Sequence, residues 1–71
     1  MNKIYCLTCN NNPVITSHDV ERLKERQKFL LNTIAEDNTI KVLHRDENAI
    51  TYHTGISYET DEFEIVELEI I

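Results

Sequence analysis

The chain has 71 residues, 41% of them hydrophobic, with one glycine, one proline and a formal net charge of −6. Its length suits a single domain, and its apolar content is that of a globular chain, which excludes fibrous and fully disordered classes. No stretch approaches the ~20 apolar residues of a membrane-spanning helix, and the apolar stretch at residues 4–9 is far shorter than a signal-peptide core. We therefore expect a cytoplasmic protein without membrane association.

The charges are divided unevenly along the chain. Residues 1–45 contain all seven Lys and Arg residues and five acids, a balance of +2, whereas residues 46–71 contain eight acids and no base, a balance of −8. An acidic field of this kind repels nucleic acid and attracts basic protein surfaces. We therefore expect no direct nucleic-acid binding by the C-terminal part.

The first half of the chain predicts one strand and one helix. Residues 3–9 are rich in strand formers and end at an Asn run and Pro13. Thr16 or Ser17 can cap a helix that runs to about Glu36. Apolar positions recur on a stripe about 100° wide, which predicts the core face of this helix. Its members are Val20, Leu23, Gln27, Leu30, Leu31 and Ile34.

Residues 39–45 predict a second strand, followed by a three-residue hairpin loop in which Asn48 takes a positive φ. This loop places His44 opposite Ile50 and Val42 opposite Tyr52. Gly55 is expected to form a bulge or a close-packing point. One face of the hairpin would then be hydrophobic, with Ile40, Val42, Ile50, Tyr52, Ile56 and Tyr58.

The last strand, residues 63–71, does not follow one alternation. Phe63 and Ile65 share one parity and Val66 and Leu68 the other, which favours a bulge near Ile65 and Val66 over a strand covered on both faces. The sequence therefore predicts a single α+β domain with the order β-α-β-β-β. One amphipathic helix packs on a three- or four-stranded, mostly antiparallel sheet. The place of the first strand stays open, parallel to the second or elsewhere.

Catalytic and metal motifs are weak. Cys6 and Cys9 have zinc-knuckle spacing, and His18 could contribute a third ligand. Side chains alternate between the two faces of a strand, however, so two cysteines three positions apart point to opposite faces. We interpret the cysteines as small apolar side chains and expect no cofactor; a small zinc-binding domain that uses Cys6, Cys9 and His18 is the alternative. A single glycine excludes a Gly-rich phosphate loop. We expect a non-enzymatic protein.

Acidic residues follow one another along the last strand. Same-face neighbours on a strand are about 6.6 Å apart, similar to successive phosphates, so a carboxylate ladder can imitate a nucleic-acid backbone. The expected bulge would bring Glu62, Glu64, Glu67 and Glu69 to one side. An acidic face can also serve solubility alone. The candidate binding acids are Glu59, Asp61, Glu62, Glu64, Glu67 and Glu69.

Phe29 is the large apolar residue outside the core stripe of the helix. It lies about 180° from Val20, beside Arg22 and Glu25, on the face expected to be wet. Aromatic residues next to Arg are typical of binding hot spots, so we expect Phe29 and Arg22 in an interface with a partner or a second copy. A homodimeric structural or accessory subunit, in which the acids only solvate the surface, is a further alternative.

In size, charge and lack of a catalytic motif, the chain resembles the small acidic proteins that phages and mobile elements use to block host nucleic-acid enzymes. The resulting hypothesis is a protein-binding inhibitor or regulator, which would act in the host-cell cytoplasm if a phage encodes it. It presents an acidic strand, as a nucleic-acid mimic, to a basic and possibly nucleic-acid-binding surface of a larger protein.

Overall fold

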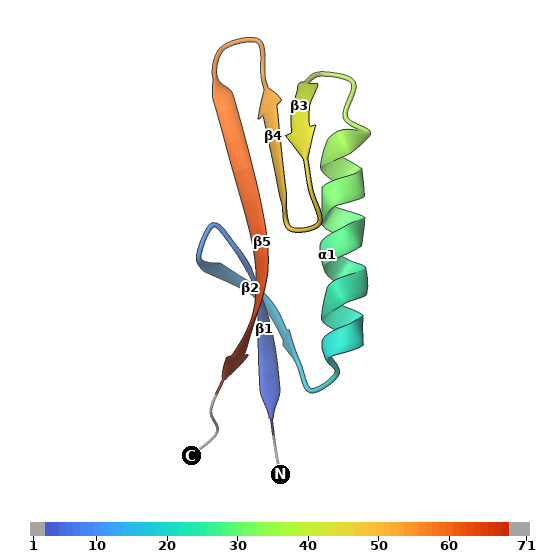
Figure 1. The fold of residues 1–71 in the computed structure, drawn as a ribbon, viewed down its shortest axis with the longest axis vertical. Helices are drawn as coiled ribbons and strands as arrows, with labels where there is room; N and C mark the ends of the chain where they lie inside the picture. Colours follow the sequence, from blue (N-terminus) through green and yellow to red (C-terminus); the bar gives the residue numbers. More distant parts are fainter. Residues whose placement is uncertain (1–2, 69–71) are drawn as a thin grey trace.

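The computed structural model describes residues 3–68. The elements in chain order are β1 (Ile4–Cys9), β2 (Asn12–Ser17), α1 (Val20–Ala35), β3 (Lys41–Arg45), β4 (Ala49–His53) and β5 (Tyr58–Leu68). All strand pairs are antiparallel, and the sheet has the order β2-β1-β5-β4-β3, with α1 against it (Figure 1). The predicted α+β class with one helix on an antiparallel sheet is confirmed, with five strands instead of three or four.

The additional strand is β2, which the sequence prediction missed. Asn10 and Asn11 have φ angles of 52° and 69°, so they form a two-residue turn of the left-handed kind that joins β1 to β2. The Asn run thus begins a hairpin where we expected a loop, and Pro13 is tolerated because β2 is an edge strand. The element order is therefore β-β-α-β-β-β, and β1 lies between β2 and β5.

Strand β5 joins the two halves of the sheet. Its first half, Tyr58 to Glu62, pairs with β4, and its second half, Phe63 to Leu68, pairs with β1. The register with β1 runs without interruption to the pair Ile4↔Leu68, so the expected bulge near Ile65 and Val66 is absent. Apolar residues instead lie on both faces of this half of β5, because Phe63 is buried against α1 while Val66 and Leu68 lie on the opposite face.

The core lies between α1 and one face of the sheet. Its fully buried cluster consists of Leu7, Leu23, Leu31, Ile50 and Phe63. The predicted helix stripe is confirmed, since α1 buries Leu23, Gln27 and Leu31. The N-cap is Asp19, whose carboxylate accepts a hydrogen bond of 3.0 Å from the backbone N–H of Glu21. Thr16 and Ser17, the caps that we expected, belong to β2.

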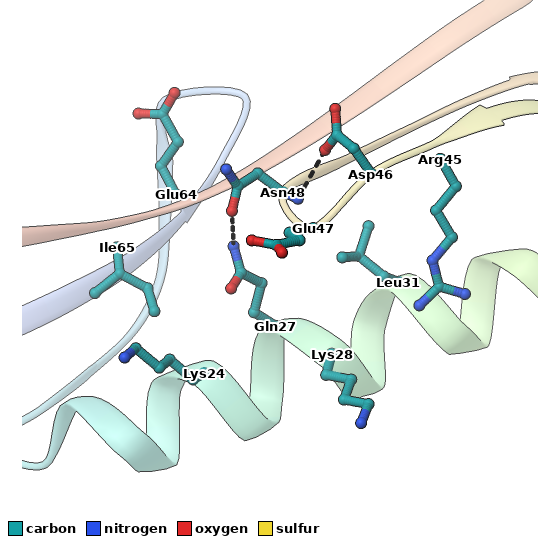
Figure 2. Close-up of a pocket in the computed structure, with 10 residues that line it drawn as sticks. All are labelled: Lys24, Gln27, Lys28, Leu31, Arg45, Asp46, Glu47, Asn48, Glu64 and Ile65. Carbon is teal, nitrogen blue, oxygen red and sulfur yellow. Dashed lines mark hydrogen bonds between the residues drawn. The ribbon is translucent and has the colours of Figure 1, made fainter.

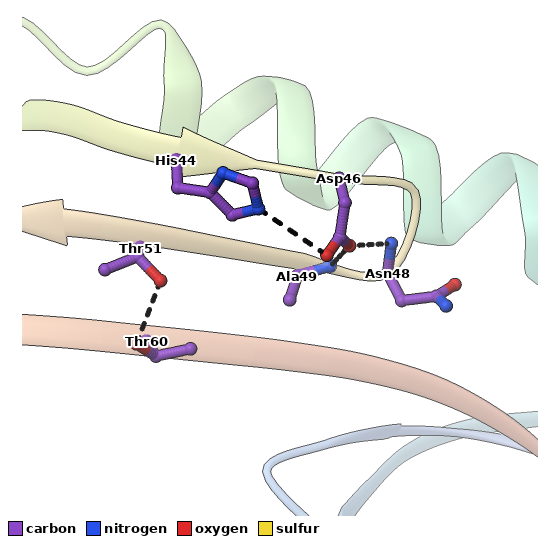
Figure 3. Close-up of polar contacts among 6 residues, drawn as sticks. All are labelled: His44, Asp46, Asn48, Ala49, Thr51 and Thr60. Atoms are coloured by element: carbon purple, nitrogen blue, oxygen red, sulfur yellow. Dashed lines mark hydrogen bonds and ion pairs between the residues drawn. The ribbon is translucent and has the colours of Figure 1, made fainter.

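The β3–β4 hairpin differs from its predicted form in register and turn. Val42 lies opposite Tyr52 as predicted, but a bulge at Leu43 places His44 opposite Thr51. Asn48 has no positive φ. The turn is held by Asp46 instead, because Asp46 Oδ1 accepts hydrogen bonds of 2.8 Å from the backbone N–H groups of Asn48 and Ala49 (Figure 3).

The predicted hydrophobic face of this hairpin is only partly formed. Ile50 is buried, but Ile56 and Tyr58 are 95% and 73% exposed because they lie in and after the loop that joins β4 to β5. Gly55 occupies this loop with φ 95°, and no heavy atom lies within 4 Å of the position of an added Cβ. The glycine is therefore required by the backbone angle and not by close packing.

Candidate functional site

The acids of β5 divide between its two faces. Phe63 points into the core, so residues of the same parity, Glu59, Asp61 and Glu67, lie on the side of α1. Glu62 and Glu64 lie on the opposite face, here called the open face. The expectation that Glu67 would join them is wrong, because it required the absent bulge. Glu69 lies outside the described residues.

The acids on the side of α1 have partners within the fold. Asp61 accepts hydrogen bonds from the Tyr52 hydroxyl at 2.9 Å and from Asn10 Nδ2 at 3.1 Å. Glu67 pairs with Lys3 at 3.5 Å. Glu59 accepts a bond of 3.0 Å from the Ser57 hydroxyl. Each of the three acids therefore has a contact within the fold, and Asp61 is the least exposed of them.

The Asp61 carboxylate also changes the acidity of its neighbours. Burial first, and then the hydrogen bond to Asp61, raises the pKa of Tyr52 to about 12. Burial, followed by the charge of Asp61, raises the pKa of the Cys9 thiol. Both groups are thus held in their protonated forms at neutral pH, where the phenol can donate to Asp61.

Glu62 and Glu64 are exposed, and no ion pair among residues 3–68 involves either of them. Their backbone is nevertheless braced by the β1–β2 turn. The Asn10 N–H donates to the Glu62 carbonyl at 2.8 Å, and the Glu62 N–H donates to Asn10 Oδ1 at 2.9 Å. The two carboxylates therefore extend from a fixed strand, with Cα atoms about 6.6 Å apart.

The open face is apolar beyond these two acids. Val66 and Leu68 continue the same alternation and are 37% and 40% exposed. Beside them on β1, Cys6 and Ile4 are the register partners of Val66 and Leu68. We use the name open strip for the four successive open-face residues of β5: Glu62, Glu64, Val66 and Leu68. The strip is acidic at one end and apolar at the other.

The exposed side of α1 carries the second predicted group of binding residues. Phe29 is 56% exposed, and the guanidinium carbon of Arg26 lies 5.3 Å from the centre of its ring. Arg22, one helical turn before Arg26, is also exposed. Phe29 thus projects from the wet side of the helix, as the wheel predicted, and the cation–π contact with Arg26 limits its freedom. Its role in an interface stays a prediction.

The structure does not bring the possible zinc ligands together. Cys6 is buried on the open face, while Cys9 has the opposite parity and is partly buried. His18 Nδ1 lies 2.8 Å from the carbonyl oxygen of Lys3. Within residues 3–68, no group of three or more His, Cys, Asp or Glu side chains could hold a metal ion.

A shallow pocket of about 1020 Å³ lies between α1 and the β3–β4 turn (Figure 2). At its centre Gln27 Nε2 donates to the Phe63 carbonyl at 2.5 Å and to Asn48 Oδ1 at 3.3 Å. Three basic and three acidic residues line it, so their formal charges balance. The sequence reasoning did not predict this pocket, although a glutamine on the apolar helix stripe was a signal. Its lining is Lys24, Gln27, Lys28, Leu31, Arg45, Asp46, Glu47, Asn48, Glu64 and Ile65.

His44 is the register partner of Thr51, and its side chain is directed toward Asp46. His44 Nε2 lies 3.9 Å from Asp46 Oδ2, and both side chains are largely exposed. The hydroxyls of Thr51 and Thr60 lie 3.1 Å from each other (Figure 3). Among the described residues neither hydroxyl is hydrogen-bonded to His44, so this arrangement lacks the nucleophile–base contact of covalent catalysis.

No helix in residues 3–68 combines the length and the apolar character needed to cross a membrane. Comparison with the models of known protein families finds no match. Neither the curated proteins nor the solved structures compared with the chain include a significant match.

Proposed function

We propose that this protein is a non-enzymatic binding module, an inhibitor or regulator, that presents the acidic end of the open strip, Glu62 and Glu64, to a basic surface of a larger protein. The observation that carries the proposal is the pair Glu62 and Glu64, which share the open face of a braced strand and have no basic partner among residues 3–68.

The spacing of these carboxylates supports a nucleic-acid-binding surface as the target. Two carboxylates that extend from Cα atoms about 6.6 Å apart on a braced strand can present charge at a spacing similar to that of successive phosphates. The backbone hydrogen bonds to Asn10 hold the strand before any partner arrives, which reduces the entropy lost on binding. A Lys- or Arg-lined groove on the partner is the matching surface.

The test is capture of a partner from an extract of the organism that encodes the protein, followed by competition. Tagged wild-type protein is expected to retain a protein that binds DNA or RNA, and added nucleic acid is expected to displace it. Glu62→Lys combined with Glu64→Lys should weaken this binding at least tenfold, with a lower association rate and a flatter salt dependence.

A matched control is available in Glu36→Lys combined with Glu47→Lys. Both acids are exposed, neither lies on β5, and the pair changes the net charge by the same amount. The control should bind as wild type does. Equal binding by the Glu62/Glu64 variant, or equal loss in both variants, would refute the proposal.

A further inference from the structure

Two exposed surfaces on opposite sides of the molecule carry complementary residues. One is the open strip of β5. The other is the outer stripe of α1, which we define as Arg22, Arg26, Phe29 and Thr33, all exposed and spaced by four, three and four residues along one helix face. The helix lies along one side of the sheet (Figure 1), and its buried residues face the core, so the outer stripe points away from the sheet.

The two surfaces match in spacing. Arg22 and Arg26 are separated by about 6 Å along the helix axis. Glu62 and Glu64 are separated by about 6.6 Å along β5. Phe29 follows Arg22 by about 10 Å, and Val66 follows Glu62 by about 13 Å, a difference that flexible side chains can span. Two Arg–carboxylate contacts and one apolar contact can therefore form in one register.

The two surfaces also match in chemistry. Exposed arginines can make bidentate contacts with carboxylates that have no base within residues 3–68. Phe29 is 56% exposed, and the apolar side chains of Val66 and Leu68 are 37% and 40% exposed. Aromatic and Arg residues are those that contribute most at protein interfaces. Charge order and apolar order run in the same direction along both surfaces.

We propose that the outer stripe of one copy docks on the open strip of a second copy. The two surfaces lie on opposite sides of one molecule and cannot meet within it, so the contact is heterologous and each added copy leaves one surface of each kind unoccupied. The net charge of −6 on each copy, together with Glu25 beside the stripe, opposes association. Assembly is therefore weak and dependent on concentration.

This contact uses the strip that the proposed function assigns to a partner, but it does not rest on that function. A second copy on the open strip would hide Glu62 and Glu64, so assembly and partner binding would compete. If the protein does not self-associate but captures a partner, only the contact between copies is refuted. If it self-associates but captures no partner, only the proposed function is refuted.

The test uses sedimentation velocity on the full chain and on two variants. The strip variant carries Glu62→Lys and Glu64→Lys, and the stripe variant carries Arg26→Ala and Phe29→Ala. Wild-type protein is expected to form dimers and larger species as its concentration rises to about 1 mM, the range in which weak contacts form. Each variant alone should raise the dissociation constant at least tenfold, and the Glu36→Lys, Glu47→Lys control should assemble as wild type does.

Mixing the two variants distinguishes this contact from a symmetric one. The strip variant keeps an intact outer stripe and the stripe variant keeps an intact open strip, so the mixture should give a complex of one copy of each and no larger species. Circular dichroism checks that both variants fold. If the lysine variant of the strip does not fold, Glu62→Gln with Glu64→Gln replaces it. A monomeric wild type at about 1 mM, or a mixture without the one-to-one complex, would overturn the proposal.

Discussion

Gln27 is the buried polar side chain of the helix stripe, and it lies at the point where strand β5 changes its pairing partner from β4 to β1. Ala49↔Glu62 is the last residue pair between β4 and β5, so the next carbonyl of β5, that of Phe63, lies where β4 has ended. Gln27 Nε2 donates to this carbonyl at 2.5 Å. The helix therefore supplies a donor at the point where one strand has been replaced by another.

Gln27→Leu is expected to lower the free energy of unfolding by about 1–3 kcal/mol, because a buried carbonyl loses its donor while the apolar volume is kept. Urea unfolding followed by circular dichroism measures this change. Thr33→Ala is the matched helix control, since the Thr33 hydroxyl is exposed and donates only to the Phe29 carbonyl. The control should change stability by less than about 0.5 kcal/mol. Equal midpoints for Gln27→Leu and wild type would contradict the role given to Gln27.

Tyr52 gives the fold a dependence on alkaline pH. Its pKa is raised from 10.0 to about 12 by burial and by Asp61, so the unfolded chain loses this proton more readily than the folded chain does. The stabilisation is fully present below pH 10 and is lost as the pH rises from 10 towards about 12. Absorbance of phenolate should show a component titrating near pH 12 that disappears in Tyr52→Phe. If the titration curves of the variant and the wild type have the same shape after scaling for the number of tyrosines, the component near pH 12 does not belong to Tyr52.

At the scale of elements, the β3–β4 turn depends on a side chain and not on an unusual backbone angle. Asp46 Oδ1 accepts two backbone hydrogen bonds, from Asn48 and Ala49, and these bonds lower the pKa of the Asp46 carboxyl below 3.8. A group with a lowered pKa stabilises the fold above its ordinary pKa, and this contribution is lost as the pH falls through the lowered value.

Asp46→Ala should therefore lower the urea midpoint at pH 7, and Asp46→Asn should lower it less because the amide oxygen can still accept both bonds. The difference between wild type and Asp46→Asn should shrink below pH 3.8 as the carboxylate is protonated. Unfolding curves at several pH values measure this. A difference that persists after protonation would assign the effect to geometry and not to charge.

The sequence predicted the elements whose pattern is long and local. The helix stripe through Leu23, Gln27 and Leu31 follows from periodicity. The first strand follows from its content of strand-forming residues. The second strand was missed because its signal lies in a turn: two Asn residues with positive φ begin a hairpin, whereas an Asn run before proline usually ends a strand.

The arrangement of the acids could not be obtained from β5 alone. Its mixed alternation fits either a bulge or a strand that is apolar on both faces, and the continuous pairing with β1 decides between them. Periodicity correctly placed Phe29 outside the core but could not tell which acids have partners. That distinction depends on Lys3, Asn10 and Tyr52, which are distant in sequence from the acids that they contact.

At the scale of the whole molecule, the described part of the chain is elongated, with extents of 47 × 18 × 16 Å. The two hairpins, β1–β2 and β3–β4, form locally, and β5 connects them through pairs distant in sequence. A small core beneath a long sheet gives a narrow margin of stability. The contacts along β5 are therefore needed to make the two halves unfold together.

The pairing of Ile4 with Leu68 has a consequence for how the chain could be reconnected. Because these residues are neighbours across two antiparallel strands, a glycine linker that joins the chain ahead of Ile4 to the chain after Leu68 would allow circular permutation. New termini opened at Gly55, where an added Cβ would have no heavy atom within 4 Å, should leave a folded protein with a cooperative urea transition. New termini between Asn10 and Asn11 should destabilise it strongly, because Asn10 braces β5 through its backbone and its side chain. The fold would thus tolerate a chain break in the loop between β4 and β5, whereas it requires an intact β1–β2 turn.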